Sequence, residues 1–411
     1  MRRWSLCLSV PCRRSRRAFC TLGLLLVIAS LVGSAPLSAA PLVRDLLAAP
    51  SACTVASIRL LTSGGDHDWS HANGLVVYDD MDEKSTWQLY TIRPNGTGRT
   101  CLTCRTRADS PLVDRQKGHG AWHPGGKYIV LQAEMDYHAG TPRTRGFATP
   151  GRGWWNNLYV TTADGRSWTR LTNYKSGSDF EGVLIPRFSH DGAQLFWAKL
   201  VGQPDDPDDW DNPNDPVVNP MGHWELWVAD FVDAAAGPAL RNARNITPVG
   251  SKGFFYESGG FTPDDSKVIF TADYDIANGF PYGYDLYTLD LTTGALVNLT
   301  NSPDEWDEHP HFSPHGNKIS FISSQVILSY DPRDINTLRG ELMLMNPDGS
   351  GLAQVTRFNT PGAPEYTVEP SIAADSAWNA DGTQISVTQI LFGDSYPERR
   401  VWIVTFNGAC G

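Results

Sequence analysis

The chain has 411 residues, of which 41% are hydrophobic and 19% are charged, and its 34 basic and 45 acidic residues give a formal net charge of −11. Six of the basic residues and none of the acidic residues lie in the first 40 positions, so the rest of the chain has 28 basic and 45 acidic residues, a net charge of −17. A surface this acidic argues against nucleic acid and anionic lipid as partners.

The chain begins with the features of an export signal at residues 1–40. Its start is basic, its apolar core (LGLLLVIASLVG, 22–33) is too short to span a bilayer comfortably, and SAPLSAAP offers small residues for cleavage. The run SRRAF at 15–19 resembles a twin-arginine export signal, and an ordinary secretory signal with a basic start is the alternative. No later run is apolar enough for a membrane helix. We therefore expect a periplasmic or secreted protein, with residues 41–55 as an N-terminal extension and residues 56–411 as a single domain.

Four cysteines follow the signal segment, and an even number in an exported chain favours disulfides. Cys53 and Cys410 lie at opposite ends of the mature chain, so they can pair only if the two ends meet. Cys101 and Cys104 form a CxxC motif. A redox site is one interpretation, but no alternating strand–helix pattern surrounds it, so we expect a local disulfide at a strand end.

A hairpin pattern recurs along the chain at about the spacing of a propeller blade. Each copy has an aromatic residue, a short turn and an alternating apolar strand. Four copies are followed by a second hairpin that ends in LT, IT or VT. The pattern predicts blades at 119–172, 181–247, 256–300 and 308–356.

Two further blades depart from the pattern. A degenerate first blade is predicted from GLVVYDD (74–80) and residues 88–104, and a sixth blade begins at Trp378 and stops one strand short. The strand ASIRLLT (56–62) has the character of the strands that close the other blades, so we expect it to complete the last blade, with Cys53–Cys410 pinning the join. The predicted fold is all-β, a six-bladed propeller of four-stranded blades without a long free edge.

The motifs PRFSHDGAQLFW and PHFSPHGNKISF, together with second hairpins such as NLYVTTADGRSWTRLT (157–172), resemble the repeat of the TolB-like (WD40-like) six-bladed propellers. The resemblance covers nearly the whole mature chain. It implies a periplasmic or secreted propeller, often one that binds proteins. It does not determine function, because propellers include both binding proteins and enzymes.

The connections of the predicted blades differ in length between the two ends of the propeller. The turns within each hairpin are uniformly short, whereas the connections between the second and third strands are long, as at 135–155, 202–224, 273–284 and 323–340. Long loops collected at one end of a rigid scaffold usually perform the function. We therefore expect the loop-rich face to be the binding face.

Acidic and imidazole side chains stand where the innermost strands begin, at the same end as the long loops. If they converge, they form a ring at the channel mouth that could bind a divalent cation (Ca²⁺ or Mn²⁺) or supply acid–base pairs. Hydrogen bonds that tie neighbouring blades together are the alternative. The candidate metal ligands are His67, His119 and His309. The complete predicted ring is His67, Asp68, His119, Glu181, Glu257, Glu308, His309 and Glu369, with Asp375 as the alternative to Glu369 in blade 6.

Aromatic residues in or beside the long loops could stack on sugar rings or anchor a peptide, and packing within the blades is the alternative. These residues are Trp154, Trp155, Trp210, Trp224, Tyr282, Tyr284 and Trp306. The acidic run DDPDDWDN (205–212) lacks the glycine turn and terminal bidentate acid of a calcium loop, so we expect a solvated loop.

These patterns favour a monomeric, non-catalytic binding module for a protein, peptide or envelope component, engaged through the loop-rich face and the channel mouth. The sequence contains no GxSxG nucleophile elbow, no HExxH motif and no glycine-rich phosphate loop. The alternative is a metal-assisted lyase or hydrolase that acts on an extracellular polysaccharide, with a glycan as its ligand.

Overall fold

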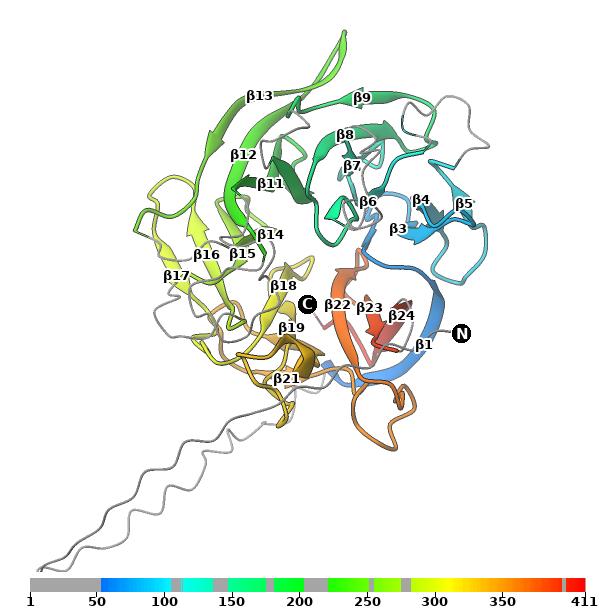
Figure 1. The fold of residues 1–411 in the computed structure, drawn as a ribbon, viewed down its shortest axis with the longest axis vertical. Helices are drawn as coiled ribbons and strands as arrows, with labels where there is room; N and C mark the ends of the chain where they lie inside the picture. Colours follow the sequence, from blue (N-terminus) through cyan, green and yellow to red (C-terminus); the bar gives the residue numbers. More distant parts are fainter. Residues whose placement is uncertain are drawn as a thin grey trace, which may run out of the picture. The chain divides into compact units, whose positions relative to one another are not determined.

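The computed structural model describes residues 53–104, 112, 114–135, 147–174, 181–202, 221–250, 255–274, 282–393 and 397–410, all of which lie in the unit Leu46–Gly411. In these residues, six antiparallel four-stranded sheets stand in a ring as the blades of a propeller (Figure 1). The prediction of an all-β, six-bladed propeller is confirmed.

The blades follow one another in chain order around the ring. Blade 1 consists of β2 (His67–Trp69), β3 (Val76–Met81), β4 (Trp87–Ile92) and β5 (Thr100–Cys101). Blade 2 consists of β6 (Lys117–Trp122), β7 (Tyr128–Glu134), β8 (Asn156–Thr162) and β9 (Trp168–Arg170). Blade 3 consists of β10 (Gly182–Phe188), β11 (Gln194–Gly202), β12 (His223–Ala234) and β13 (Gly237–Asn245). Blade 4 consists of β14 (Tyr256–Phe261), β15 (Lys267–Ala272), β16 (Asp285–Asp290) and β17 (Leu296–Asn298). Blade 5 consists of β18 (Asp307–Phe312), β19 (Ile319–Ser323), β20 (Glu341–Met345) and β21 (Ala353–Gln354), and a short 3-10 helix at Ile335–Thr337 precedes β20.

The sixth sheet joins the two ends of the described chain. Its order is β1 (Val55–Ser63), β24 (Glu398–Phe406), β23 (Gln384–Leu391) and β22 (Ser371–Trp378), and β1 pairs antiparallel with β24. A disulfide links Cys53 to Cys410 beside this pair, and a second links Cys101 to Cys104. Because β1 supplies the outermost strand of the last blade, the ring closes through hydrogen bonds rather than through loops alone.

Each inner hairpin turns through a residue in the left-handed region, where glycine has no steric cost. Gly126 (φ 68°) and Gly316 (φ 74°) occupy this position in blades 2 and 5, and Gly74 (φ 72°) occupies it in the degenerate first blade. In blade 4 the residue is Asp265 (φ 56°), since a short polar side chain tolerates this conformation. This left-handed residue, usually a glycine, therefore determines where the inner strand ends and the second strand begins.

The innermost strands carry β-bulges. The register shifts in β6, β10, β14, β18 and β22, each time two to four residues before the aromatic residue that ends the strand. Pro186 and Pro310 lie within two of these shifts, and proline within a sheet is largely confined to bulges and edges because it cannot donate a ladder hydrogen bond. A bulge redirects the side chains that follow it, which here are those nearest the propeller axis.

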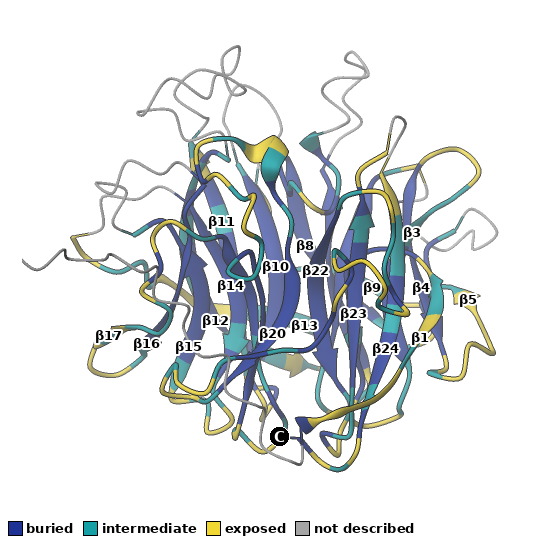
Figure 2. Cartoon of the chain, turned by 90° about the horizontal axis from the view of Figure 1, so that it is seen from below, coloured by how far each residue is buried: buried dark blue, intermediate teal, exposed yellow. Residues whose placement is uncertain are grey.

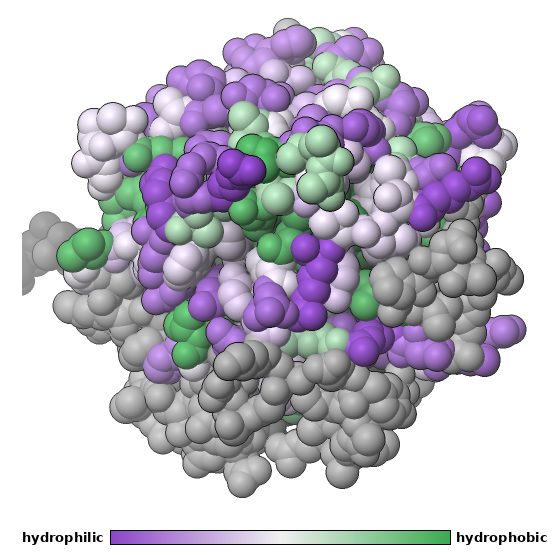
Figure 3. Space-filling view, turned by 90° about the horizontal axis from the view of Figure 1, so that it is seen from above, coloured by the Kyte–Doolittle hydropathy of each residue, from purple (hydrophilic) through white to green (hydrophobic). Residues whose placement is uncertain are grey.

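Burial follows the blades, with buried strands and exposed residues at turns and strand ends (Figure 2). The largest hydrophobic cluster spans several blades and includes Phe196, Phe270 and Leu342. On the side shown in Figure 3, hydrophilic residues surround smaller apolar areas. None of the helices within the described ranges combines the length and the apolar character that a bilayer span requires.

We predict that the two disulfides contribute very differently to stability. Replacing Cys53 and Cys410 with serine removes a link between residues 357 positions apart and should lower the free energy of unfolding by about 2–5 kcal/mol. Replacing Cys101 and Cys104 removes a link across three positions and should cost much less. Denaturant unfolding of both double variants, monitored by tryptophan fluorescence, checks this. Equal midpoints for the two variants would contradict it.

Candidate functional site

The propeller axis is lined by two layers of side chains that are in register between blades. In each inner strand, the residue three positions before the terminal aromatic residue belongs to a central layer. The residue one position earlier belongs to a pocket layer. The central layer contains Asp66, His119, Ile185, Ser258, His309 and Asp375, and the pocket layer contains Asp68, Ala121, Arg187, Gly260, His311 and Ala377.

Three members of the central layer have strained backbones. His119 (φ 45°), Ile185 (φ 46°) and His309 (φ 52°) adopt the left-handed conformation at the bulges of their strands. This conformation is costly for residues other than glycine, and most unusual for a β-branched residue such as isoleucine. The bulges therefore hold two imidazoles at the axis against a local backbone preference, which is a feature of functional sites.

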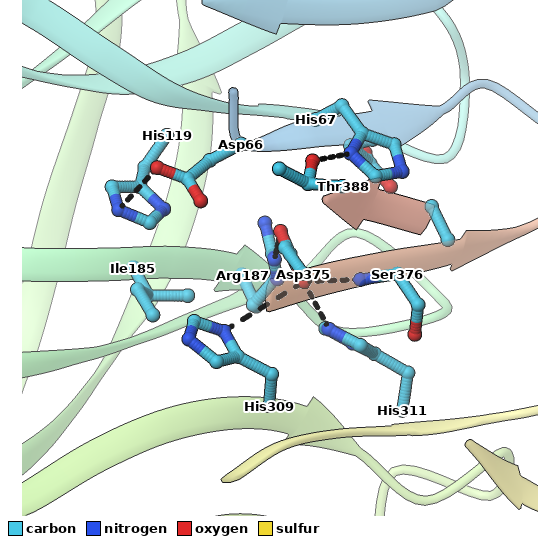
Figure 4. Close-up of polar contacts among 12 residues, drawn as sticks. Asp66, His67, His119, Ile185, Arg187, His309, His311, Asp375, Ser376 and Thr388 are labelled. Atoms are coloured by element: carbon cyan, nitrogen blue, oxygen red, sulfur yellow. Dashed lines mark hydrogen bonds and ion pairs between the residues drawn. The ribbon is translucent and has the colours of Figure 1, made fainter. Parts of the chain in front are cut away.

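An ion-pair network crosses the axis between blades 3, 5 and 6 (Figure 4). Arg187 donates from Nη2 to Asp375 Oδ2 at 2.8 Å, and His311 Nε2 lies 2.8 Å from Asp375 Oδ1. Burial opposes the ionisation of Asp375, but the Arg187 guanidinium and His311 hold its pKa well below the usual range. Asp375 is therefore a carboxylate, and it is the anionic centre of the network.

A first group of possible metal ligands lies beside this network. Asp66, His119 and Asp375 are buried, and each offers one ligand atom within 4.8 Å of the others. Asp66 Oδ2 lies 3.2 Å from His119 Nε2. Burial lowers the pKa of His119 to about 4, so its imidazole is neutral at physiological pH. Neither ring nitrogen of His119 has a well-formed hydrogen bond among the described residues, which leaves lone-pair capacity for a cation.

A second group of possible ligands is formed by Glu257, Glu308 and His309. His309 Nε2 lies 3.6 Å from Glu257 Oε2 and 3.8 Å from Glu308 Oε2. Burial raises the pKa of each glutamate to about 8. Glu257 Oε2 is buried and has no hydrogen-bond partner within the described part of the chain. The two groups adjoin, because His309 Nδ1 is 3.8 Å from Asp375 Oδ1.

A cavity of about 190 Å³ opens at one end of the axis. All six pocket-layer residues line it, together with the aromatic residue that ends each inner strand. His71, His123 and His190, which belong to the short inner-hairpin turns, also line it. This cavity therefore lies at the short-turn end of the axis, opposite to the loop-rich face on which the sequence placed the binding site.

The structure separates the residues of the predicted ring. His119, Glu257, Glu308 and His309 belong to the two groups above. Asp68 lies in the pocket layer, where its Oδ2 accepts a hydrogen bond from the Trp122 backbone N–H at 2.6 Å. Of the three predicted metal ligands, His119 and His309 thus fall into different groups.

The other three members of the predicted ring belong to neither group. His67 is buried, and its Nδ1 lies 3.0 Å from Thr388 Oγ1. Glu181 is half-buried, and its side chain lies 3.7 Å from Lys199 Nζ. Glu369 is exposed on the connection before β22, and Asp375 occupies the axial position in blade 6.

The aromatic residues assigned to the loop face prove to be core residues. Trp210 and the run 205–212 lie outside the described residues. The other six are at most 9% exposed and belong to one hydrophobic cluster, so in these positions they pack between blades: Trp154, Trp155, Trp224, Tyr282, Tyr284 and Trp306. For these six, burial favours the alternative interpretation, packing within the blades, because the chain segments beside the strands return to the blades and bury their large side chains.

Sequence reasoning missed Asp66, Arg187 and His311 as members of the site, and it named Asp375 only as the alternative to Glu369 in blade 6. A usable signal was present in the repeat. All four residues lie three positions or one position before the terminal aromatic residue of their inner strand, so this aromatic residue is a better reference point than the start of the strand. The register is obscured in the sequence because the bulge adds one residue to the inner strand of most blades.

We predict that Asp375 is essential to the stability of the propeller. Asp375→Ala leaves the buried Arg187 without its carboxylate and should lower the free energy of unfolding by about 3–5 kcal/mol. Glu369→Ala removes an exposed carboxylate from the same blade and should change it by less than about 0.5 kcal/mol. Urea unfolding of both variants measures the difference. A stable Asp375→Ala variant would show that the axial ion pair does not support the fold.

Comparison with known proteins gives distant similarities. No family model matches the chain. Dipeptidyl-peptidase 5 of Porphyromonas endodontalis is 25% identical over 276 residues, which are 60% of this chain and 34% of the relative, so the chain spans about a third of the length of the curated relative it matches.

Solved structures with a similar fold include three kinds of protein. TolB from Acinetobacter baumannii matches with a TM-score of 0.46 and 14% identity, over 83% of this chain and 65% of that chain. A puromycin-hydrolysing peptidase of Mycobacterium tuberculosis matches with a TM-score of 0.44 and 14% identity, over 84% and 45%. An oligogalacturonate lyase from Vibrio parahaemolyticus matches with a TM-score of 0.44 and 9% identity, over 85% and 93%. By its repeats and its six four-stranded blades, the chain is a six-bladed β-propeller that resembles the TolB-like propellers.

Proposed function

We propose that this chain is an exported binding propeller whose central channel holds a divalent cation. Its ligand is a protein, a peptide or an envelope component that engages the loop-rich end of the channel. The basic, apolar and small-residue segments of the first 40 positions support export. The contents of the channel support the cation.

The group Glu257, Glu308 and His309 is the observation on which the cation proposal rests. The two glutamates are each 7% exposed, and within the described residues no lysine or arginine lies at ion-pair distance from either. Burying a carboxylate without a compensating charge is expensive, which is why the pKa of each glutamate rises to about 8 and each holds a proton at neutral pH when no cation is bound. A divalent cation held by two carboxylates and an imidazole would compensate both. Two carboxylates and an imidazole suit Mn²⁺ better than Ca²⁺, because Ca²⁺ prefers oxygen ligands alone.

Exposed apolar side chains support a partner at the loop-rich end. Val249, Leu328 and Val368 are 98%, 103% and 82% exposed, and each lies on a connection between blades or between the second and third strands of a blade. These connections lie at the end where the inner strands begin, which is the end closer to the glutamates. Apolar side chains exposed on a rigid scaffold can provide contact area for a protein or peptide.

A metal-assisted lyase or hydrolase acting on an acidic polysaccharide is the second candidate. It is favoured by the neutral His119 imidazole beside Asp66, since such a pair can take up and release a proton near a bound cation. The cation would stabilise negative charge on the substrate. The acid and imidazole residues would perform the proton transfers.

We predict one tightly bound divalent cation for each chain. Mass-spectrometric metal analysis of protein purified without chelator should find it, and Glu257→Gln/Glu308→Gln should lose it because both carboxylate ligands become neutral amides. Glu181 belongs to neither group of possible ligands, so the Glu181→Gln variant should retain the cation. Added Mn²⁺ at 100 times its Kd should stabilise the wild-type protein by about 2.7 kcal/mol. The absence of any stoichiometric ion in the wild type would refute the cation proposal.

We predict that binding, rather than turnover, depends on the loop-rich end. Leu328→Ser/Val368→Ser should weaken capture of a specific partner from envelope extract without changing the melting temperature, since both side chains are exposed. The competing enzyme proposal predicts cleavage of polygalacturonate or alginate by the metal-loaded protein, detected as new ultraviolet absorbance or reducing ends. Glycan cleavage that is abolished by Glu257→Gln/Glu308→Gln would establish the enzyme and displace the binding module.

A further inference from the structure

The cavity at the short-turn end is built by alternation around the axis. In the pocket layer, blades 1, 3 and 5 supply Asp68, Arg187 and His311, while the blades between them supply Ala121, Gly260 and Ala377. Three polar groups therefore face a space that three small residues leave open. The walls above this floor are the terminal aromatic residues of all six inner strands: Trp69, Trp122, Phe188, Phe261, Phe312 and Trp378.

Arg187 has hydrogen-bonding capacity that the described residues do not use. It is 7% exposed, and only its Nη2 is bonded, to Asp375. Its Nε and Nη1 are buried and have no partner within the described ranges. Buried guanidinium N–H groups almost always have acceptors, so two unpaired donors in the wall of a cavity indicate a missing acceptor. A carboxylate is a suitable acceptor for a guanidinium N–H, and one carboxylate can accept from Nε or from Nη1 but not from both, because these two atoms lie on different edges of the guanidinium.

Asp68 presents the opposite charge from the other side of the same floor. Its Oδ2 accepts the Trp122 N–H, and no basic side chain described in the structure lies within ion-pair distance of it. The charge of Asp68 also acts on Arg187, so one guanidinium balances two carboxylates, Asp68 and Asp375, and the floor has an excess negative charge. A simple anion would increase this imbalance, whereas a ligand with an ammonium group beside its carboxylate would correct it.

We propose that this cavity binds a free α-amino acid with an apolar side chain. The carboxylate of the ligand accepts from Arg187, its ammonium group lies against Asp68, and its side chain packs among the aromatic walls. A mostly apolar pocket with a few convergent polar groups is the usual form of a small-molecule site. Aromatic faces add a favourable field for the ammonium group.

This site differs from the proposed cation site in position and in ligands. Asp68 and Ala377 belong to neither acid–imidazole group, and the cavity opens at the end opposite to the long loops. Amino-acid binding measured in the presence of a chelator therefore tests this site alone. The two proposals can fail independently.

Isothermal titration calorimetry with L-phenylalanine tests the site in the exported protein with its disulfides intact. N-acetyl-L-phenylalanine lacks the ammonium group and L-phenylalanine amide lacks the carboxylate, and each should bind about tenfold more weakly or worse. Asp68→Asn keeps an acceptor for the Trp122 N–H and removes the charge. In this variant L-phenylalanine should bind about tenfold more weakly and should no longer be preferred over its N-acetyl derivative.

Two further variants complete the design. Ala377→Leu fills the cavity and should abolish binding. Asp348→Asn removes an exposed carboxylate in the turn between β20 and β21, where it is bonded to Ser350; neither residue lines the cavity, so binding should be unchanged. The proposal is overturned if L-phenylalanine produces no binding heat with the wild type. It is equally overturned if Asp68→Asn still prefers L-phenylalanine over the N-acetyl derivative.

Discussion

Closure of the ring is the constraint on which the rest of the structure depends. The chain supplies three strands for its last blade, and only the pairing of β1 with β24 gives that blade a fourth strand. The disulfide between Cys53 and Cys410 holds the two chain ends together at this join. The axial site exists only in the closed ring, since its side chains come from all six blades. Anything that opens the join therefore separates the ligands from one another.

Closure also explains why charged groups can persist on the axis. Six inner strands, five of them bulged, bring acids, imidazoles and one guanidinium into a buried region where a charge without a partner is costly. Asp375 resolves part of the problem by serving Arg187 and His311 together. Glu257, Glu308 and Asp68 remain without a cationic side chain within the described residues. The unbalanced acids suggest that the channel is shaped for positively charged groups from outside the chain.

The two ends of the axis have different chemistry, although the same strands build both. Toward the long connections lie carboxylates and imidazoles in a spacing suited to a metal ion. Toward the short turns lies a cavity with aromatic walls and a floor of opposite charges. The bulges separate the two regions, because the left-handed residues His119 and His309 mark where the strand changes which side chains face the axis. One scaffold thus presents two regions of different chemistry, and we propose a separate binding site in each.

The sequence by itself determined the architecture of this protein. The recurring aromatic residue, left-handed turn and alternating strand predict the blades, since these are local preferences that each repeat satisfies alone. The number of blades and the pairing of Cys53 with Cys410 also followed from that pattern. Only the tertiary structure decided the site. Asp66, Arg187 and Asp375 lie far apart in the chain and meet because the ring closes, and the residue that each bulge adds obscures their common register in the sequence. Burial likewise depends on packing between blades, which is why Trp154 and Trp224 proved to be core residues and Glu369 proved to be exposed.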